Sequence, residues 1–384
     1  MSTEIVFLSL TVFVTCIFLG LSYRVDRKLS LVGKIHLTPK VSVIIPAHNK
    51  ARLLKKCINS VESSSYPNKE IIVVDDCSSD ETGKILKNIR GIKIIHNKKR
   101  LGKCQSLNNA AKKTSSGLIL FLDADTFVEK DTIERLVSSY SHYKKVEGKI
   151  GFVSPRYNII KGQNFLAKLA YMEQAIHQFL IKIQMNFDSI LAIRGCCLLV
   201  NKKAFFEVHG FSNHILEDGD FAAKMKKADY KMKYEPRANV ETDEPETIND
   251  FFRTRKRYGK GGLFCVIDHT RHFVFSKQAV LSFYPYILIY AAFLGFSVIT
   301  TGIMNTFLLS LSFFGILGLT STIGMFFCGA ITAKDSLEKT SILALFLPYV
   351  FFYIPFAAVG YLQGILSGVK DRWKGRGKLK LKEW

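Results

Sequence analysis

The segment LILFLDAD, residues 118–125, predicts the central strand of the fold and the polar residues that follow it. Its five leading apolar residues, 118–122, predict a strand that is buried on both faces, as in a parallel sheet covered by helices. The strand ends in two carboxylates, Asp123 and Asp125, separated by one small residue. Ligands of open α/β sheets bind beyond the carboxyl ends of the strands, and paired oxygen ligands suit a divalent cation that also takes phosphate oxygens. The other interpretation is a solvated turn, because acidic pairs of this spacing are common by accident.

Three more strands and three helices are predicted upstream of this stretch. The strands cover residues 41–45, 70–74 and 92–95, and apolar residues at helical spacing indicate helices over 53–61, 82–88 and 100–113. Strand–helix–strand units of this spacing predict a parallel sheet with right-handed crossovers. We therefore expect an α/β fold in which polar residues gather at the carboxyl ends of at least three strands.

The charge and hydropathy of the chain indicate a membrane surface. The 384 residues carry a formal net charge of +22, which suits either nucleic acid or anionic lipid, and 48% of them are hydrophobic. Long apolar stretches cover residues 5–23 and several segments after residue 281. The sequence contains no zinc-finger spacing, basic helix or aromatic–basic repeat of a nucleic-acid binder. We therefore expect the membrane as a partner and no nucleic acid.

Charges that flank the first apolar stretch predict its orientation. Residues 1–4 contain no lysine or arginine, whereas four basic residues follow the stretch: Arg24, Arg27, Lys28 and Lys34. The positive-inside rule then predicts a retained anchor with its N-terminus outside and residues 25–277 in the cytoplasm. The eight cysteines form no C-x-x-C pair, which suits free thiols.

Three further spans are predicted near residues 281–301, 305–330 and 341–364. Three crossings would leave the C-terminus outside, yet the dense lysines and arginines of residues 370–382 favour the inside. Pro348 and Pro355 allow a broken or re-entrant last segment, so its crossing stays open. The chain is expected to divide into an N-terminal anchor (1–24), a cytoplasmic α/β domain (25–250), an interfacial segment (251–280), a transmembrane region (281–369) and a basic tail (370–384).

Short motifs follow the ends of the predicted strands. They are VSVIIPAHN (41–49), VDDCSSDET (74–82), RLGKCQSLN (100–108), FLDAD (121–125), GF (210–211) and LEDGDF (216–221). Their order and spacing, over about residues 41–262, resemble the family 2 glycosyltransferases. The resemblance implies a GT-A domain, a Rossmann-like nucleotide-diphosphosugar transferase that inverts the anomeric centre. With the C-terminal apolar segments, the chain is also similar to membrane synthases of poly-N-acetylglucosamine, chitin oligosaccharide, hyaluronan and cellulose.

One side of the site is implied to bind the nucleotide. Asp76 matches the family's base-contacting carboxylate, where it could accept the imide hydrogen bond of a uracil or the equivalent donor of a guanine. Three consecutive residues match the backbone wall beside the nucleotide: Pro46, Ala47 and His48. Lys103 would supply positive charge near the phosphates. A solvated helix face is the other interpretation of Lys103 and of Asn108, which follows it on the same predicted helix.

The resemblance also implies a divalent metal. Asp123 and Asp125 would bind Mg²⁺ or Mn²⁺ through the donor's diphosphate, with Asp125 as the direct ligand and Asp123 also on the nucleotide side. The metal would act as a Lewis acid on the departing nucleoside diphosphate. Lys50 departs from the family pattern, because many relatives carry Glu there. It adds positive charge near the nucleotide, and we assign it no role from the sequence.

Inversion by direct displacement needs a base for the acceptor hydroxyl. In the family's E-D pattern the second residue is that base, which places it at Asp218, next to Glu217 on the acceptor side. The other interpretation is an acidic helix N-terminus that only favours the helix dipole. Gly195 resembles the small residue that lets the acceptor approach the sugar.

The acceptor side carries the main departure from the processive synthases, which have Q-x-x-R-W. Here Arg257 and Tyr258 preserve the charge and the aromatic ring, but Thr254 replaces the glutamine and tyrosine replaces tryptophan. Processivity is therefore left open. Part of this basic cluster has another interpretation, as a juxtamembrane anchor to anionic lipid.

We therefore expect a multi-pass membrane glycosyltransferase with a cytoplasmic catalytic domain. It would move a sugar from a UDP- or GDP-sugar to a lipid-linked or growing polysaccharide acceptor. The first alternative is a non-processive polyprenyl-phosphate glycosyltransferase, which adds one sugar per acceptor. The second is a non-catalytic membrane scaffold or export subunit that retains the fold.

Overall fold

The computed structural model describes residues 16, 19–33, 38–159, 165–187, 190, 194–242, 247–270 and 354–373. The predicted spans at 281–301 and 305–330, most of the first span, the first part of the third and the tail beyond residue 373 lie outside the described residues. Within the described ranges, we find no helix with both the length and the apolar character needed to cross a bilayer.

One mixed sheet organises the described part of the chain. Within it, eight strands lie in the order β3-β2-β1-β4-β7-β6-β8-β5. Their bounds are β1 (Val41–Ala47), β2 (Lys69–Asp75), β3 (Lys93–His96), β4 (Leu118–Leu122), β5 (Thr126–Val128), β6 (Ile150–Ile159), β7 (Cys197–Asn201) and β8 (Lys231–Thr242). The first four strands are parallel, which confirms the prediction for that half of the sheet.

The second half of the sheet differs from an all-parallel arrangement. β7 runs antiparallel to both β4 and β6, and its first residue, Cys197, pairs with Leu122, the last residue of β4. Because of this reversal, the segment before β7 arrives at the same sheet edge as the carboxyl end of β4. Residues 194–196 are thereby brought beside Asp123, from which they are far apart in the sequence.

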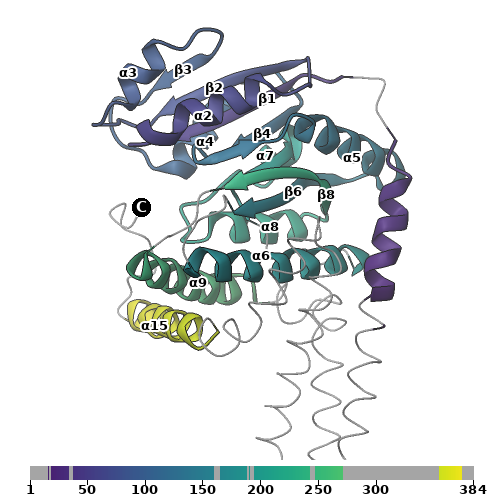
Figure 1. The fold of residues 1–384 in the computed structure, drawn as a ribbon, viewed down its shortest axis with the longest axis vertical. Helices are drawn as coiled ribbons and strands as arrows, with labels where there is room; N and C mark the ends of the chain where they lie inside the picture. Colours follow the sequence, from purple (N-terminus) through teal and green to yellow (C-terminus); the bar gives the residue numbers. More distant parts are fainter. Residues whose placement is uncertain are drawn as a thin grey trace, which may run out of the picture.

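Helices cover the sheet and extend away from it (Figure 1). They are α2 (Ala51–Glu62), α3 (Thr82–Lys87), α4 (Lys103–Lys112), α5 (Thr132–Glu147), α6 (Phe165–Gln184), α7 (Lys202–Glu207), α8 (Glu217–Lys227), α9 (Ile248–Asp268) and α15 (Ile354–Trp373), with a short 3₁₀ turn, η1 (Met185–Phe187). In Figure 1, α6, α9 and α15 lie one below another under β6 and β8. Residues 19–30 form a further helix whose Asp26 pairs with Lys182 near the end of α6 at 2.7 Å.

The core confirms the prediction that residues 118–122 form a buried strand, β4. All five residues of β4 are at most 4% exposed. Behind the strand, Phe121 packs on Phe205 and Phe211 with ring centroids 5.0 Å apart in both pairs, and Phe211 packs on Phe221 at 4.7 Å. Such aromatic pairs add about 0.5–1.5 kcal/mol each beyond the area they bury. They hold α7, the Gly210–Phe211 turn and α8 in fixed positions against β4.

α15 packs on α9 with very close backbone approach. A Cβ on Gly259 would lie 2.3 Å from the carbonyl oxygen of Tyr361, and one on Gly364 would lie 2.2 Å from that of Lys256. Only glycine allows helices to approach this closely. Residues 354–364, which belong to the third predicted span, therefore lie within a helix that contacts α9.

Candidate active site

Five chain segments meet at the carboxyl edge of β1, β2 and β4. Ala47 is the register partner of Asp75, and the Asp76 amide donates to the Ala47 carbonyl at 2.8 Å, which joins the ends of β1 and β2. The Asp123 amide donates to the carbonyl of Cys196 at 2.9 Å, which joins the end of β4 to the segment before β7. The N-terminus of α8 also lies here, because its first residue, Glu217, contacts Lys103.

Each carboxylate of the acidic pair lies against a lysine. Lys103 Nζ is 2.8 Å from Asp123 Oδ1, and Lys50 Nζ is 2.6 Å from Asp125 Oδ2. The side chains of Asp123 and Asp125 are only 27% and 26% exposed. The pair therefore does not form a freely solvated turn.

Lys103 connects the two sides of the site. Its ammonium also lies 3.0 Å from Oε1 of Glu217, the first residue of α8, so that it bridges the end of β4 and the start of α8. Burial opposes its charge, but Asp123 and Glu217 outweigh burial and hold the pKa of Lys103 well above its usual value. Lys103 is not on a solvated helix face.

Asn108 is also turned inward, and its contacts are structural. Its side-chain amide donates to the Phe211 carbonyl at 2.7 Å, and its carbonyl oxygen accepts from the Phe211 amide at 3.0 Å. The preceding Gly210 has φ +64, where a residue with a side chain is strained. Asn108 therefore fixes the turn that precedes α8, and the solvated-face interpretation is wrong for it.

Asp76 is 4% exposed, and its carboxylate accepts three hydrogen bonds from one loop. It accepts from the amides of Leu101 and Gly102 and from the side chain of Asn97, each at 2.8 Å. Burial raises the pKa of Asp76, but these hydrogen bonds outweigh burial, and the net pKa is below the usual value. Asp76 thus stays ionised and holds the loop that leads into α4. Its contact with a base stays a prediction.

The predicted backbone wall lies at the end of β1. Pro46 and Ala47 are the last two residues of that strand, and Nδ1 of His48 is 2.9 Å from the Asp76 carbonyl. Asn49 has φ +54, and its side-chain oxygen accepts from the Ser79 amide at 2.9 Å. The loops after β1 and β2 are therefore tied to each other.

Asp218 is held by two backbone amides. Oδ2 accepts from Gly195 and Oδ1 from Gly219, each at 2.8 Å. Burial and the adjacent charge of Glu217 raise the pKa of Asp218 to about 6. An acidic helix N-terminus exposed to solvent would not show such a raised pKa, because burial is its main cause. The geometry therefore gives a fixed carboxylate that can take up a proton near neutral pH.

Gly195 allows the loop before β7 to contact Asp218 closely. A Cβ at this position would lie 2.9 Å from the Asp218 Cβ and 3.2 Å from its Oδ2. The neighbouring Arg194 lies with its guanidinium carbon 5.1 Å from the ring centroid of Tyr157, and it hydrogen-bonds Tyr258 of α9. Burial raises the pKa of Tyr258, but Arg194 and Arg257 outweigh it and the net pKa is lowered. Tyr258 is thus connected to the Asp218 side of the site.

Arg257 is more exposed to solvent than Tyr258, the next residue in the sequence. It is exposed on α9, with its guanidinium carbon 5.3 Å from the Tyr258 ring centroid. The buried arginine of this helix is Arg255, 3% exposed and paired with Glu173 of α6. The sequence reasoning overlooked Arg255. Its position four residues after the buried Phe251 and four before the buried Gly259 is the signal that could have identified it.

The carboxylates of Asp123 and Asp125 fit a divalent cation that also binds the phosphates of a substrate. Within the described part of the chain, no group of three or more His, Cys, Asp or Glu side chains could hold a metal ion by itself. Mg²⁺ is bound in this manner elsewhere, by one or two carboxylates together with substrate phosphates and water. The two carboxylates Asp123 and Asp125 are therefore a sufficient protein contribution.

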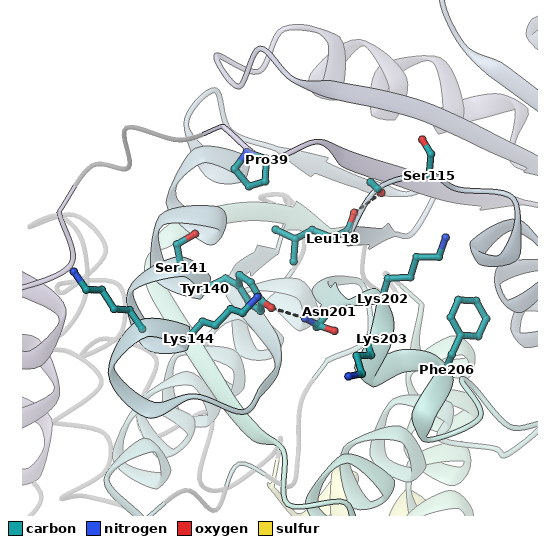
Figure 2. Close-up of a pocket in the computed structure, with 13 residues that line it drawn as sticks. Pro39, Ser115, Leu118, Tyr140, Ser141, Lys144, Asn201, Lys202, Lys203 and Phe206 are labelled. Atoms are coloured by element: carbon teal, nitrogen blue, oxygen red, sulfur yellow. Dashed lines mark hydrogen bonds between the residues drawn. The ribbon is translucent and has the colours of Figure 1, made fainter.

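A separate pocket opens at the opposite, amino edge of β1 and β4 (Figure 2). Four lysines line it: Lys144, Lys145, Lys202 and Lys203. Tyr140 and Asn201, also in its wall, hydrogen-bond each other. None of the predicted site residues lines this pocket.

Comparisons with known proteins agree with this arrangement. The family model described as Glycosyl transferase family 2 matches residues 42–208. Two curated relatives from Staphylococcus epidermidis, both named poly-beta-1,6-N-acetyl-D-glucosamine synthase, are 28% identical over 303 residues (75% of this chain, 72% of the relative) and 29% identical over 288 residues (71% and 68%). A relative of the same name from Staphylococcus aureus strain COL is 26% identical over 227 residues, 58% of this chain and 54% of the relative.

A solved structure shares the fold. The mannosyltransferase PcManGT from Pyrobaculum calidifontis, in complex with GDP-Man and Mn²⁺, matches over 95% of this chain and 99% of its own, with a TM-score of 0.56. Its sequence identity of 17% makes this a likeness of fold alone. Together with the parallel half-sheet and the reversed β7, it supports the predicted α/β fold of the GT-A type.

Proposed function

We propose that this chain, which matches the family 2 glycosyltransferase model over residues 42–208, transfers a sugar from a nucleoside diphosphate sugar to an acceptor at a membrane surface. One observation carries the proposal. Lys103 bridges Asp123, on the donor side, and the buried Glu217, next to the half-buried Asp218 on the acceptor side. The carboxylate proposed to bind the metal and the proposed general base would thus lie close together at one edge of the sheet, as displacement at a sugar carbon requires.

The donor would lie over the ends of β1, β2 and β4. Asp76 and the wall formed by Pro46, Ala47 and His48 would hold the nucleoside, and Asp123 and Asp125 would hold a divalent metal with the diphosphate. When bound, Mg²⁺ or Mn²⁺ neutralises the diphosphate and stabilises its departure. The structure of PcManGT was obtained with GDP-Man and Mn²⁺, which supports a nucleotide sugar and a metal here.

Asp218 would act as the general base. The acceptor hydroxyl attacks the anomeric carbon, the bond from that carbon to the diphosphate oxygen breaks, and Asp218 takes the hydroxyl proton. Attack opposite to the leaving group inverts the anomeric centre. The two backbone amides on Asp218 hold its position, and a carboxylate has lone pairs left to accept the proton.

The acceptor would approach past Gly195 and Tyr258. Tyr258 supplies a ring for stacking against a sugar, and Glu217 and Arg257 border the same side. Because the curated relatives are named as poly-beta-1,6-N-acetyl-D-glucosamine synthases, we favour a growing polysaccharide over a polyprenyl phosphate as the acceptor. A lipid-linked saccharide has the same chemistry at its reacting hydroxyl.

Product analysis tests these alternatives. The full chain, purified in lipid nanodiscs, is offered a panel of radiolabelled UDP- and GDP-sugars with membrane-extract acceptors, and the products are separated by size. A ladder of products from one donor is expected. One sugar per acceptor would indicate the non-processive polyprenyl-phosphate enzyme, and no transfer from any donor would favour the scaffold.

Activity should depend on pH through Asp218. The carboxylate must be deprotonated to accept a proton, and its pKa is raised to about 6. We expect kcat/KM to be constant at higher pH and to fall about tenfold per unit below about pH 6. The pH profile measured at low donor concentration checks this. A flat profile between pH 5 and 7, with nucleotide binding constant over that range, would contradict the assignment.

The membrane part of the proposal is supported by the two faces of α15. One face carries Gly360, Gly364 and Gly368, whose added Cβ atoms would each contact α9. The other face exposes four apolar residues spaced three or four apart: Val359 (48%), Leu362 (57%), Leu366 (69%) and Val369 (52%). Basic Lys370 and Arg372 follow in the last turn. An apolar face beside basic residues is typical of a helix that lies in the membrane interface.

This packing also predicts on which side of the membrane the C-terminus lies. Since α15 contacts α9, which follows the catalytic domain, both would lie on the cytoplasmic side, as the basic tail also favours. A fluorescent-protein fusion after Trp384 should be bright, and an alkaline phosphatase fusion there inactive. The reverse pattern would contradict this topology.

A further inference from the structure

The two lysines that neutralise the acidic pair are held very differently. Lys103 contacts two carboxylates, those of Asp123 and Glu217, and its side chain is 22% exposed. Lys50 contacts one oxygen of one carboxylate, Asp125 Oδ2, and its side chain is 42% exposed. Lys103 is therefore a fixed part of the site, whereas the side chain of Lys50 can leave at little cost.

The backbone of Lys50 is fixed, so any movement is confined to its side chain. The Lys50 amide donates to Oγ1 of Thr82 at 2.9 Å, and the next amide, of Ala51, donates to Oδ2 of Asp80 at 3.2 Å. Asn49, on the other side, is tied to Ser79. A flexible four-carbon stem thus starts from a rigid point between the loops proposed to hold the nucleotide.

We propose that Lys50 is a displaceable counter-ion of Asp125 that makes metal binding depend on the nucleoside diphosphate. The inference rests on the proposed function. A divalent cation that binds Asp125 would either replace the ammonium on Oδ2 or bind the other oxygen beside it, and in both cases the nearby ammonium would repel the cation. The diphosphate of a donor offers the ammonium another anionic partner. Metal and nucleotide would then each strengthen the binding of the other.

Because such coupling is reciprocal, it can be measured as the change in Mn²⁺ affinity when nucleotide is added. Mn²⁺ binding to the purified full chain is followed by electron paramagnetic resonance, first without nucleotide and then with saturating UDP or GDP, whichever binds. In Lys50→Gln, Mn²⁺ alone should bind about three- to tenfold more tightly than in the wild type. The gain in Mn²⁺ affinity on adding nucleotide should shrink by a similar factor.

Two matched variants control for charge and folding. Lys55→Gln removes the same charge from an exposed position on α2 and should leave both Mn²⁺ affinities at the wild-type values. Lys50→Arg keeps the cation and should keep the coupling. If Lys50→Gln binds Mn²⁺ no more tightly than the wild type, while the wild type still binds Mn²⁺ with nucleotide, the counter-ion role is wrong and the proposed function stands. If the wild type binds no Mn²⁺ even with nucleotide, the metal of the proposed function is wrong as well.

Discussion

Asp218→Asn is expected to lower kcat about 10²–10⁴-fold, the range typical of a lost general base. The variant cannot accept the proton of the acceptor hydroxyl. One of the two amide contacts of Asp218, to Gly195 or Gly219, remains available to the side-chain oxygen of asparagine. The protein should therefore fold, and nucleotide affinity should change little because the proposed donor contacts lie at or just after the ends of β1, β2 and β4. Sugar transfer and nucleotide binding are measured on the same preparation.

Asp229→Asn is the matched control for this variant. Asp229 is exposed just after the end of α8, and its φ of +59 is one that asparagine tolerates. It should transfer sugar at the wild-type rate. Asp218→Asn that keeps more than a tenth of the wild-type kcat would show that another group takes the proton.

Gly195→Ala should lower kcat about 10–100-fold without weakening nucleotide binding. The new methyl group would lie 2.9 Å from the Asp218 Cβ, so the loop or the base must move by several tenths of an ångström. Displacement of a reacting group by about 1 Å can cost about 100-fold in rate. Single-turnover transfer and nucleotide titration separate the two effects.

Gly117→Ala tests whether the loss is specific. Gly117 also precedes a strand, and an added Cβ there meets nothing within 4 Å. This variant should behave as the wild type. Equal activities in the two alanine variants would mean that the contact between Gly195 and Asp218 does not control the rate.

The donor side of the site could be predicted from the sequence because it depends on local sequence patterns. An apolar run predicts β4, and the carboxylates that follow it must lie at the sheet edge. The antiparallel direction of β7 could not be predicted, because no local sequence pattern sets the direction of one buried strand relative to another. Yet this reversal places Gly195 against Asp218. The motif resemblance assigns both residues to the acceptor side but does not imply that they contact each other.

Side-chain partners were the least predictable feature. Lys50 and Asp125 are separated by 75 positions, and only the register of β1 against β4 brings them together. The motif identifies Arg257, which precedes an aromatic residue, whereas the burial of Arg255 depends on the packing of α6 and α15 against α9. Asn108 was open to a solvated-face interpretation because its partner, Phe211, lies 103 positions away. Charge and hydropathy cannot encode such long-range contacts.

The most direct test of the central claim is metal-dependent turnover at this sheet edge. The full chain in nanodiscs, with the donor found in the panel and a membrane-extract acceptor, is assayed for nucleoside diphosphate release with Mn²⁺, with EDTA, and with Mn²⁺ restored. We predict release with Mn²⁺, loss with EDTA, recovery on restoration, and no recovery in Asp125→Asn. Release that is unaffected by EDTA and by Asp125→Asn would contradict a metal-assisted transfer centred on the two carboxylates after β4.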